Sequence, residues 1–299
     1  METNKILQTP PRLLTQSKRE EYFEKGFVTL ENIISVEWIT RLSICSDRLL
    51  EESRAVTESN DAFDLGPQHN DRSPHVRRLK ALVDRDPVYW EFASESLLGD
   101  IAADLVGPDV KFHSSKLNYK WPGSGEVVKW HQDIPAWPHT NYSLVTLGVY
   151  LEDVTEIKGP LVSIPKSHDG PLFFHTDDNG KWSGTINEDD MENVDQNSAE
   201  KMLGPAGSVA AINCRTIHSS AENLSERVRP VALFVFSSAD AFAWMPQPTP
   251  TSKTGQIIRG SPARIAHLDP RPCPVPPNWE KEGYNSIFTA QRVDENKVM

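Results

Sequence analysis

Residues 129–137 read KWHQDIPAW, a short run in which a histidine and an aspartate stand two positions apart among apolar and aromatic residues. Side chains two apart on a β-strand point to the same side, so His131 and Asp133 are expected to face one way and Gln132 the other. Burying an imidazole and a carboxylate is costly unless each has a partner, and one metal ion can serve both. The stretch therefore predicts a strand that carries two metal ligands.

Further runs rich in β-branched and aromatic residues, separated by Gly and Pro, follow from about residue 109 onward. They are VKFHSSKLNYKW (110–121), EVVKWHQDI (126–134), SLVTLGVYLEDV (143–154), GPLVSIP (159–165), SVAAIN (208–213) and RPVALFVFSSA (229–239). No helix of crossover length separates them, which argues against a doubly wound parallel sheet. A sandwich or barrel is expected over residues 109–245.

The first 108 residues are expected to be mainly helical. Helical patterns cover 17–27, 35–53 and 86–109, whereas residues 54–85 are polar and have no clear pattern. Ser35 and the pair Asp86-Pro87 are typical helix starts, and Gly26 and Gly107-Pro108 are typical stops.

Two further segments depart from the strand pattern. Residues 176–203 are acidic and polar, which is typical of an insertion between strands, a mobile lid or a solvated loop. Residues 246–299 are rich in proline and are expected to be extended. We therefore expect one domain over 1–299, with helices, a β core and a tail.

Charge and cysteine content narrow the class of protein. The formal net charge of −11 disfavours nucleic acids and anionic membrane surfaces as partners, and a small anionic ligand would need a local Arg or Lys. Cys45, Cys214 and Cys273 are scattered, which suits a reducing compartment such as the cytoplasm. A soluble enzyme with a small-molecule substrate is expected, and the tail leaves a homodimer open.

The chain contains two other His-x-Asp triplets, and both have simpler interpretations. Asp177 stands in FFHTDDNGKW, where Asp-Asn-Gly is a strong turn signal and the aspartate can bond its own backbone. His267 and Asp269 lie in HLDPRP, a proline-rich stretch without strand alternation. The pair at 131 and 133 is therefore the preferred chemical site.

A third ligand is expected from another strand, and His218 is the candidate. It follows GPAGSVAAINCRTI, an apolar strand bounded by glycine, although a histidine capped by a neighbouring serine in a surface turn is the simpler alternative. Two histidines and one carboxylate on one side of an ion form the facial triad of non-haem Fe(II) oxygenases. A zinc hydrolase could use the same ligands.

Arg229 favours iron over zinc. It opens the strand PVALFVFSS beyond His218, and an iron oxygenase that uses 2-oxoglutarate needs a cation for the far carboxylate of that co-substrate. The alternative for Arg229 is a surface ion pair with Glu222 or Glu226. Arg227 could fill the same role, but it lies two residues earlier and is therefore expected in the turn before the strand.

The order HQD, GPLVSIPKSH and HSSAENLSERVR resembles the phytanoyl-CoA dioxygenase family of Fe(II)/2-oxoglutarate oxygenases, which includes ectoine hydroxylase. The resemblance is best over residues 109–236. It implies a double-stranded β-helix core, which is a cupin-like jelly roll flanked by helices, and it implies Fe(II), 2-oxoglutarate and O2 as cofactor and co-substrates. The expected reaction is hydroxylation of a C–H bond, with release of succinate and CO2.

The resemblance also assigns residues. His131, Asp133 and His218 match the iron ligands of the family, and Arg229 matches its 2-oxoglutarate arginine. Asn118 and Ser220 match residues that contact the co-substrate, and Ser114 stands where some members use glutamine. Asp133 is replaced by alanine or glycine in halogenating relatives, so its presence disfavours halogenation. The sequence after Asp133, IPAWPHTNYS, departs from ectoine hydroxylases and disfavours ectoine as substrate.

Substrate contacts are predicted more loosely. The candidates are aromatic or histidine residues near strand ends, each of which could instead pack in the core: Trp137, Tyr142, Phe174, His175, Phe242 and Trp244. A zinc-dependent hydrolase and a non-catalytic, metal-binding cupin-like protein remain as alternatives. An Arg229 that faces the metal would favour the oxygenase over both.

Overall fold

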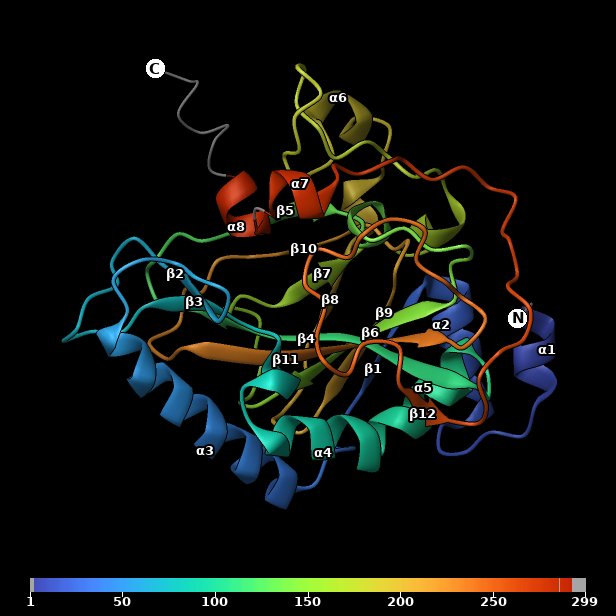
Figure 1. The fold of residues 1–299 in the computed structure, drawn as a ribbon, viewed down its shortest axis with the longest axis horizontal. Coiled ribbons are helices and arrows are strands. Elements are labelled where there is room, and N and C mark those ends of the chain that lie inside the picture. The colour runs from blue at the N-terminus through green and yellow to red at the C-terminus, as the bar shows by residue number, and fades with distance from the viewer. Residues whose placement is uncertain (1–2, 285, 292–299) are drawn as a thin grey trace.

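The structure is a computed structural model, which describes residues 3–284 and 286–291. Two antiparallel β-sheets form its centre, and helices cover one side of the larger sheet (Figure 1). The helices are α1 (Thr3–Gln8), α2 (Gln16–Lys25), α3 (Val36–Glu52), α4 (Pro87–Glu95), α5 (Leu98–Val106), α6 (Glu188–Met191), α7 (Trp279–Glu282) and α8 (Ile287–Ala290). The strands are β1 (Phe27–Leu30), β2 (Phe63–Leu65), β3 (Val76–Lys80), β4 (Val110–Lys120), β5 (Val128–His131), β6 (Leu144–Tyr150), β7 (Leu161–Ser163), β8 (Glu200–Met202), β9 (Val209–Asn213), β10 (His218–Ser220), β11 (Arg229–Ser238) and β12 (Ile257–Arg259).

The larger sheet has the order β1-β9-β6-β11-β4-β3-β2, with β12 also paired to β4, and the smaller sheet has the order β5-β10-β7-β8. β11 lies at the centre of the larger sheet, between β4 and β6, and all of its residues are buried. One face of this sheet packs against α3, α4 and α5 through apolar side chains such as Phe92 and Phe234, whose rings are 5.4 Å apart. The opposite face of the larger sheet lines a cavity, to which β4 and β11 contribute side chains.

Local sequence signals set the ends of the first helices as expected. α2 ends at Lys25 because Gly26 adopts a left-handed conformation with φ of 89°, which favours glycine. α3 begins after Ser35, whose hydroxyl accepts a hydrogen bond from the Trp38 N–H. These two segments agree with the helical patterns at 17–27 and 35–53.

The helical pattern over 86–109 is broken, so that α4 and α5 replace one longer helix. Ser96 is extended, and its hydroxyl accepts a hydrogen bond from the Leu98 N–H. Arg259, from the tail, donates hydrogen bonds to the main-chain oxygens of Ser94 and Ser96. The break thus depends on a contact between distant parts of the chain, which helical periodicity does not report.

The first 108 residues also contain three strands that the helical expectation missed. β1 pairs with β9, β3 pairs with β4, and β2 extends the sheet beyond β3. These strands are short and lie at the ends of the sheet order, so their local sequence signal is weak. Their pairing partners lie far along the chain.

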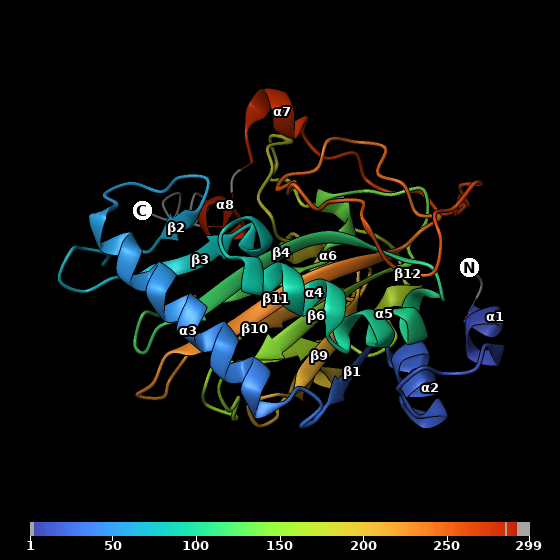
Figure 2. The ribbon, with the colours of Figure 1, turned by 60° about the horizontal axis from the view of Figure 1, so that its bottom comes forward.

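The expected insertion and tail both contribute regular elements. Residues 200–202 form β8, which pairs with β7 in the smaller sheet, and Asp177 accepts hydrogen bonds from the Asn179 and Lys181 N–H groups in the expected turn. The tail is extended in part, but it also forms β12, α7 and α8. α7 and α8 lie on the opposite side of the larger sheet from α3 and α4 (Figure 1 and Figure 2).

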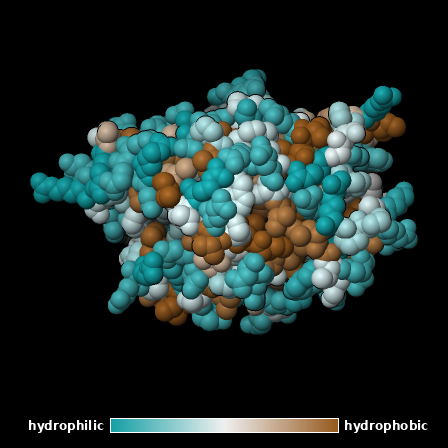
Figure 3. Space-filling model, turned by 90° about the horizontal axis from the view of Figure 1, so that it is seen from below, coloured by the Kyte–Doolittle hydropathy of each residue, from teal (hydrophilic) through white to brown (hydrophobic). Residues whose placement is uncertain are grey.

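Figure 3 views the face on which α3 and α4 lie, which is mostly hydrophilic around a central apolar area. Within the described ranges, every helix is too short or too polar to cross a membrane.

Candidate metal centre and its cavity

His131 and His218 are brought together by the smaller sheet. They are paired residues of β5 and β10, and their ring centroids lie 4.1 Å apart. The Nδ1 atom of His131 lies 2.9 Å from the Lys129 main-chain oxygen, and that of His218 lies 2.9 Å from the Thr216 oxygen. With Nδ1–H donating to these carbonyls, both Nε2 atoms carry free lone pairs for a metal ion.

Asp133 reaches the same point by a route that strand alternation does not describe. β5 ends at His131, and Asp133 has helical φ and ψ of −72° and −43° at the start of the short 3-10 turn Ile134–Ala136. The Ile134 N–H donates to the Cys214 oxygen, 3.0 Å away, which holds the turn against the chain that leads to β10. The expectation of an extended strand through Asp133 is therefore wrong, because the strand turns two residues early.

The strand expected to end at His218 also differs. β9 stops at Asn213, a turn follows, and His218 is the first residue of β10 in the other sheet. Asn213 and Thr216 close this turn through a backbone hydrogen bond of 2.9 Å. The turn moves His218 from the larger sheet to the smaller one, beside His131.

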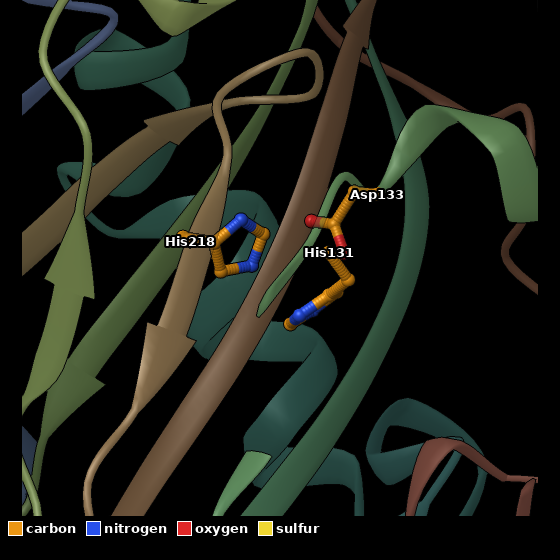
Figure 4. Close-up of side chains that lie close together, drawn as sticks. All are labelled: His131, Asp133 and His218. Atoms are coloured by element: carbon orange, nitrogen blue, oxygen red, sulfur yellow. The ribbon is translucent and has the colours of Figure 1, made fainter. Parts of the chain in front are cut away.

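The three side chains point toward one another (Figure 4). One potential ligand atom from each of His131, Asp133 and His218 lies within 4.8 Å of the other two. Among the residues that the structure describes, this is the one group of three or more His, Cys, Asp or Glu side chains that could hold a metal ion.

Electrostatics favour the protonation states that bind metal. Burial, reinforced by neighbouring His218, holds the pKa of His131 well below its ordinary value, so the ring is neutral. Burial opposes ionisation of Asp133, but His218 and Lys116, with the Thr146 hydrogen bond, outweigh it and lower its pKa to about 2. The Thr146 hydroxyl also donates to Asp133 Oδ2 over 2.9 Å. Two imidazoles and one carboxylate on one side of a point fit a divalent ion such as Fe(II) or Zn(II).

Arg229 lies in the cavity that the three ligands line. It opens β11 opposite Lys120 of β4 and is 3% exposed. Its Nη2 donates to the Gly159 oxygen over 2.7 Å, while its Nε has no hydrogen-bond partner. Burial lowers its pKa to about 10, so it remains charged at neutral pH. No described carboxylate forms an ion pair with it, in contrast to Arg227, which is exposed and bonds Glu152.

The other residues expected to hold the co-substrate divide into two groups. Asn118 and Ser220 line the cavity, on β4 and β10. Ser114 also lies on β4, but it lines a separate small cavity, with its hydroxyl 2.9 Å from His113 Nδ1. The structure therefore does not bring Ser114 to the metal centre.

Two of the six expected substrate residues line the cavity, namely Trp137 and His175. Tyr142 is buried elsewhere, and its hydroxyl donates to the Arg271 and Pro272 oxygens of the tail. The remaining three are exposed to a substantial degree and do not line the cavity: Phe174, Phe242 and Trp244. Position near a strand end did not distinguish these aromatic residues, because the direction of each side chain depends on packing.

Sequence reasoning missed several lining residues. The most polar are Arg78, Lys116, Lys120 and Tyr284. The alternation K-L-N-Y-K at 116–120 is a usable signal, since it puts polar side chains on one strand face and Leu117 and Tyr119 on the other. Arg78 and Tyr284 carry no such signal, because they come from β3 and from the tail.

Comparison with known structures defines the class of fold. EctD from S. alaskensis, in its apoform, is similar with a TM-score of 0.66 and 22% identity, covering 84% of this chain and 88% of that chain. The non-haem alpha-ketoglutarate-dependent carbocyclase SnoK is similar with a TM-score of 0.62 and 21% identity, covering 80% and 90%. The fold is therefore the mostly β fold of these non-haem oxygenases.

Sequence comparison gives the family. The phytanoyl-CoA dioxygenase (PhyH) profile matches residues 22–231, and this chain belongs to that family. A probable alpha-ketoglutarate-dependent hypophosphite dioxygenase of Stutzerimonas stutzeri is 28% identical, over 75% of this chain and 79% of that protein. The ectoine dioxygenase of Sphingopyxis alaskensis is 26% identical, over 71% and 72%. The L-proline trans-4-hydroxylase of Streptomyces griseoviridis is 28% identical, over 55% and 68%.

Proposed function

We propose that this chain is an Fe(II)- and 2-oxoglutarate-dependent dioxygenase that hydroxylates a C–H bond of a small metabolite and releases succinate and CO2. The observation that carries the proposal is the buried, unpaired guanidinium of Arg229 in the cavity of His131, Asp133 and His218. A buried cation without a counter-ion costs several kcal/mol, which a bound carboxylate would offset. The relatives named as 2-oxoglutarate-dependent enzymes support the same conclusion.

Each residue has a defined task in this proposal. His131, Asp133 and His218 would hold the iron from one side, and Arg229 would bind the far carboxylate of 2-oxoglutarate. Asn118 and Ser220 would add hydrogen bonds from opposite walls. The bound iron supplies the oxidative chemistry with O2, which no side chain of the cavity provides. Val231 and Leu233, two and four residues beyond Arg229 on β11, would add apolar lining beside the arginine.

We further assign the two antiparallel sheets to a double-stranded β-helix, the jelly-roll arrangement, within one oxygenase domain over 1–299. The pairing of β5 with β10 and of β11 with both β4 and β6 supports this assignment. In that arrangement His131 and His218 lie on the smaller sheet, Asp133 lies in the turn that follows β5, and Arg229 lies on the larger sheet.

A zinc hydrolase and a non-catalytic metal-binding protein explain the three ligands but give Arg229 no task. Anaerobic titration with Fe(II) and then 2-oxoglutarate distinguishes the oxygenase from these two alternatives. The native protein and Arg227→Gln should develop a weak visible charge-transfer band, and Arg229→Gln should require much more 2-oxoglutarate for it. A native protein that binds Fe(II) but gives no band would reject the proposal.

A further inference from the structure

The cavity around the metal ligands contains more positive charge than iron and 2-oxoglutarate require. Four basic side chains line it, Arg78, Lys116, Lys120 and Arg229, while Asp133 is the one lining carboxylate among the described residues. This concentration is notable in a chain whose net charge is −11. A local field of this kind attracts anions that the molecule as a whole repels.

Two of these basic groups are already accounted for. Lys120 donates from Nζ to the Glu126 and Ser220 oxygens, at 3.0 and 2.8 Å, and to the Ala221 oxygen, and burial lowers its pKa to about 6, so it is mostly uncharged at neutral pH. Arg229 is assigned to the far carboxylate of 2-oxoglutarate. Neither group is left to bind a further ligand.

Lys116 is different. It lies on the same face of β4 as Asn118 and Lys120, and its ammonium group makes no hydrogen bond or ion pair with any described residue, although Asp133 is close enough to raise its pKa. Burial and nearby Arg78 lower its pKa to about 8, with Asp133 opposing, so the ammonium group is still mostly present at neutral pH. Lys116 thus offers a cation without a hydrogen-bond partner in the cavity beside Asp133.

Arg78 forms the second half of this feature. It lies on β3 opposite Asn118, and its Nε donates to Asn118 Oδ1 over 3.0 Å. The Phe288 ring lies 5.0 Å from its Cζ, and Tyr284 also interacts with it. These neutral contacts from the tail hold the guanidinium in place without cancelling its charge.

The charge balance of the loaded site shows what is missing. A divalent ion, the Asp133 carboxylate, doubly charged 2-oxoglutarate and Arg229 together come to neutrality. The positive charges of Lys116 and Arg78 then remain uncompensated in a site closed by Tyr284 and Phe288. Buried charges are normally paired, so the partner is expected to arrive with the substrate.

We propose that Lys116 and Arg78 form the substrate subsite of this enzyme and that its substrate is a small anion that carries an oxidisable hydrogen, with an oxyanion or carboxylate group held by the two cations. This inference rests on the proposed function and specifies its substrate class. A cavity for a zwitterionic substrate would need a second carboxylate, besides Asp133, to bind the ammonium group of that substrate. Among the described lining residues Asp133 is the one carboxylate, which favours an anion.

The test is anaerobic calorimetry on the full chain loaded with Fe(II) and 2-oxoglutarate in low-chloride buffer. The anionic probes are hypophosphite and propanoate, and the zwitterionic probes are L-proline and ectoine. We expect the native protein to bind at least one anion more tightly than either zwitterion. Lys116→Met and Arg78→Met should each weaken that binding at least 10-fold, whereas affinity for 2-oxoglutarate should change less than 2-fold. The matched control is Lys111→Met, on the same strand outside the cavity, which should leave anion affinity unchanged.

Three results would overturn the inference: tighter binding of the zwitterions than of both anions, unchanged anion affinity in the variants, or an equal loss of 2-oxoglutarate affinity in Lys116→Met. The last result would assign the lysine to the co-substrate. Retained 2-oxoglutarate binding shows that a variant is folded, and Arg78→Met decides the matter if Lys116→Met does not fold. Failure of the native protein to bind 2-oxoglutarate would instead contradict the proposed function, so the two failures are distinguishable.

Discussion

His131 and His218 are direct partners across β5 and β10, with ring centroids 4.1 Å apart and both Nδ1 atoms bonded to main-chain oxygens. Two imidazoles held this close are stabilised by a shared metal ion. We expect His218→Ala to abolish stoichiometric Fe(II) binding, as measured by equilibrium dialysis under anaerobic conditions. His267→Ala, an exposed histidine paired with Asp240, is the control and should bind one equivalent. Full Fe(II) binding by His218→Ala would contradict the assigned site.

The Thr146 hydroxyl orients the Asp133 carboxylate through a 2.9 Å hydrogen bond from the neighbouring sheet. Removal of such a supporting contact typically lowers metal affinity about 10–100-fold. Thr146→Val keeps the shape of the side chain and should show this loss in a competition assay with a metal chelator. Thr146→Ser should retain most of the affinity, and equal affinities for the valine and serine variants would argue against the role.

Arg229→Gln tests the co-substrate site separately from the metal site. Loss of a buried charge partner costs about 2–5 kcal/mol, so the KM for 2-oxoglutarate should rise by about 30-fold or more. Fe(II) affinity should stay near the native value, because Arg229 is not a ligand. Arg227→Gln removes an exposed arginine two residues away and should have little effect on either quantity. A similar rise in KM for both variants would point to a general charge effect.

The tail closes the cavity through specific contacts. Trp279 donates from Nε1 to the Ala136 oxygen over 2.8 Å and packs edge-on against Trp182, while Gln291 bonds Lys129 and Gly184. Trp279→Ala should admit water and raise the succinate formed without substrate severalfold, because a closed site suppresses side reactions. Glu280→Ala, at an exposed neighbour, should not. Unchanged uncoupled turnover in Trp279→Ala would show that the tail does not seal the site.

Buried His139 should make the stability of the metal-free protein depend on pH. Burial lowers the pKa of His139 to about 4, against about 6.5 in the unfolded chain. Between these values the unfolded chain binds a proton at this histidine and the folded chain does not, so acid favours unfolding. Its effect is absent above about pH 6.5 and grows as the pH falls, at about 1.4 kcal/mol per pH unit. Between pH 6.5 and 5, the free energy of unfolding measured in urea should therefore fall by about 2 kcal/mol less for His139→Asn than for the native protein. Parallel pH profiles would contradict this assignment.

The local sequence predicted features that depend on neighbouring residues. Ser35 and Gly26 set helix ends, Asp177 set a turn, and Arg229 opened its strand as expected. The pattern His131, Asp133, His218 and Arg229 also indicated the chemistry, because few residue types bind iron and a carboxylate together. These signals depend on capping, turn geometry and ligand chemistry, which act over short distances.

Other expectations failed where a distant contact decided the geometry. Arg259 supports the break between α4 and α5, and Asp133 lies in a turn held by Cys214 rather than in a strand. Tyr142, Phe174, Phe242 and Trp244 were plausible by position, yet packing directs them away from the cavity.

The sequence by itself determined the strand-rich core and the family to which the chain belongs, and it predicted the types of the candidate ligands. Only the tertiary structure decided which cations share the cavity, since Arg78, Lys116 and Tyr284 come from β3, β4 and the tail. The physical reason is that side-chain type is local, whereas the pairing or isolation of a buried charge depends on every segment packed around it.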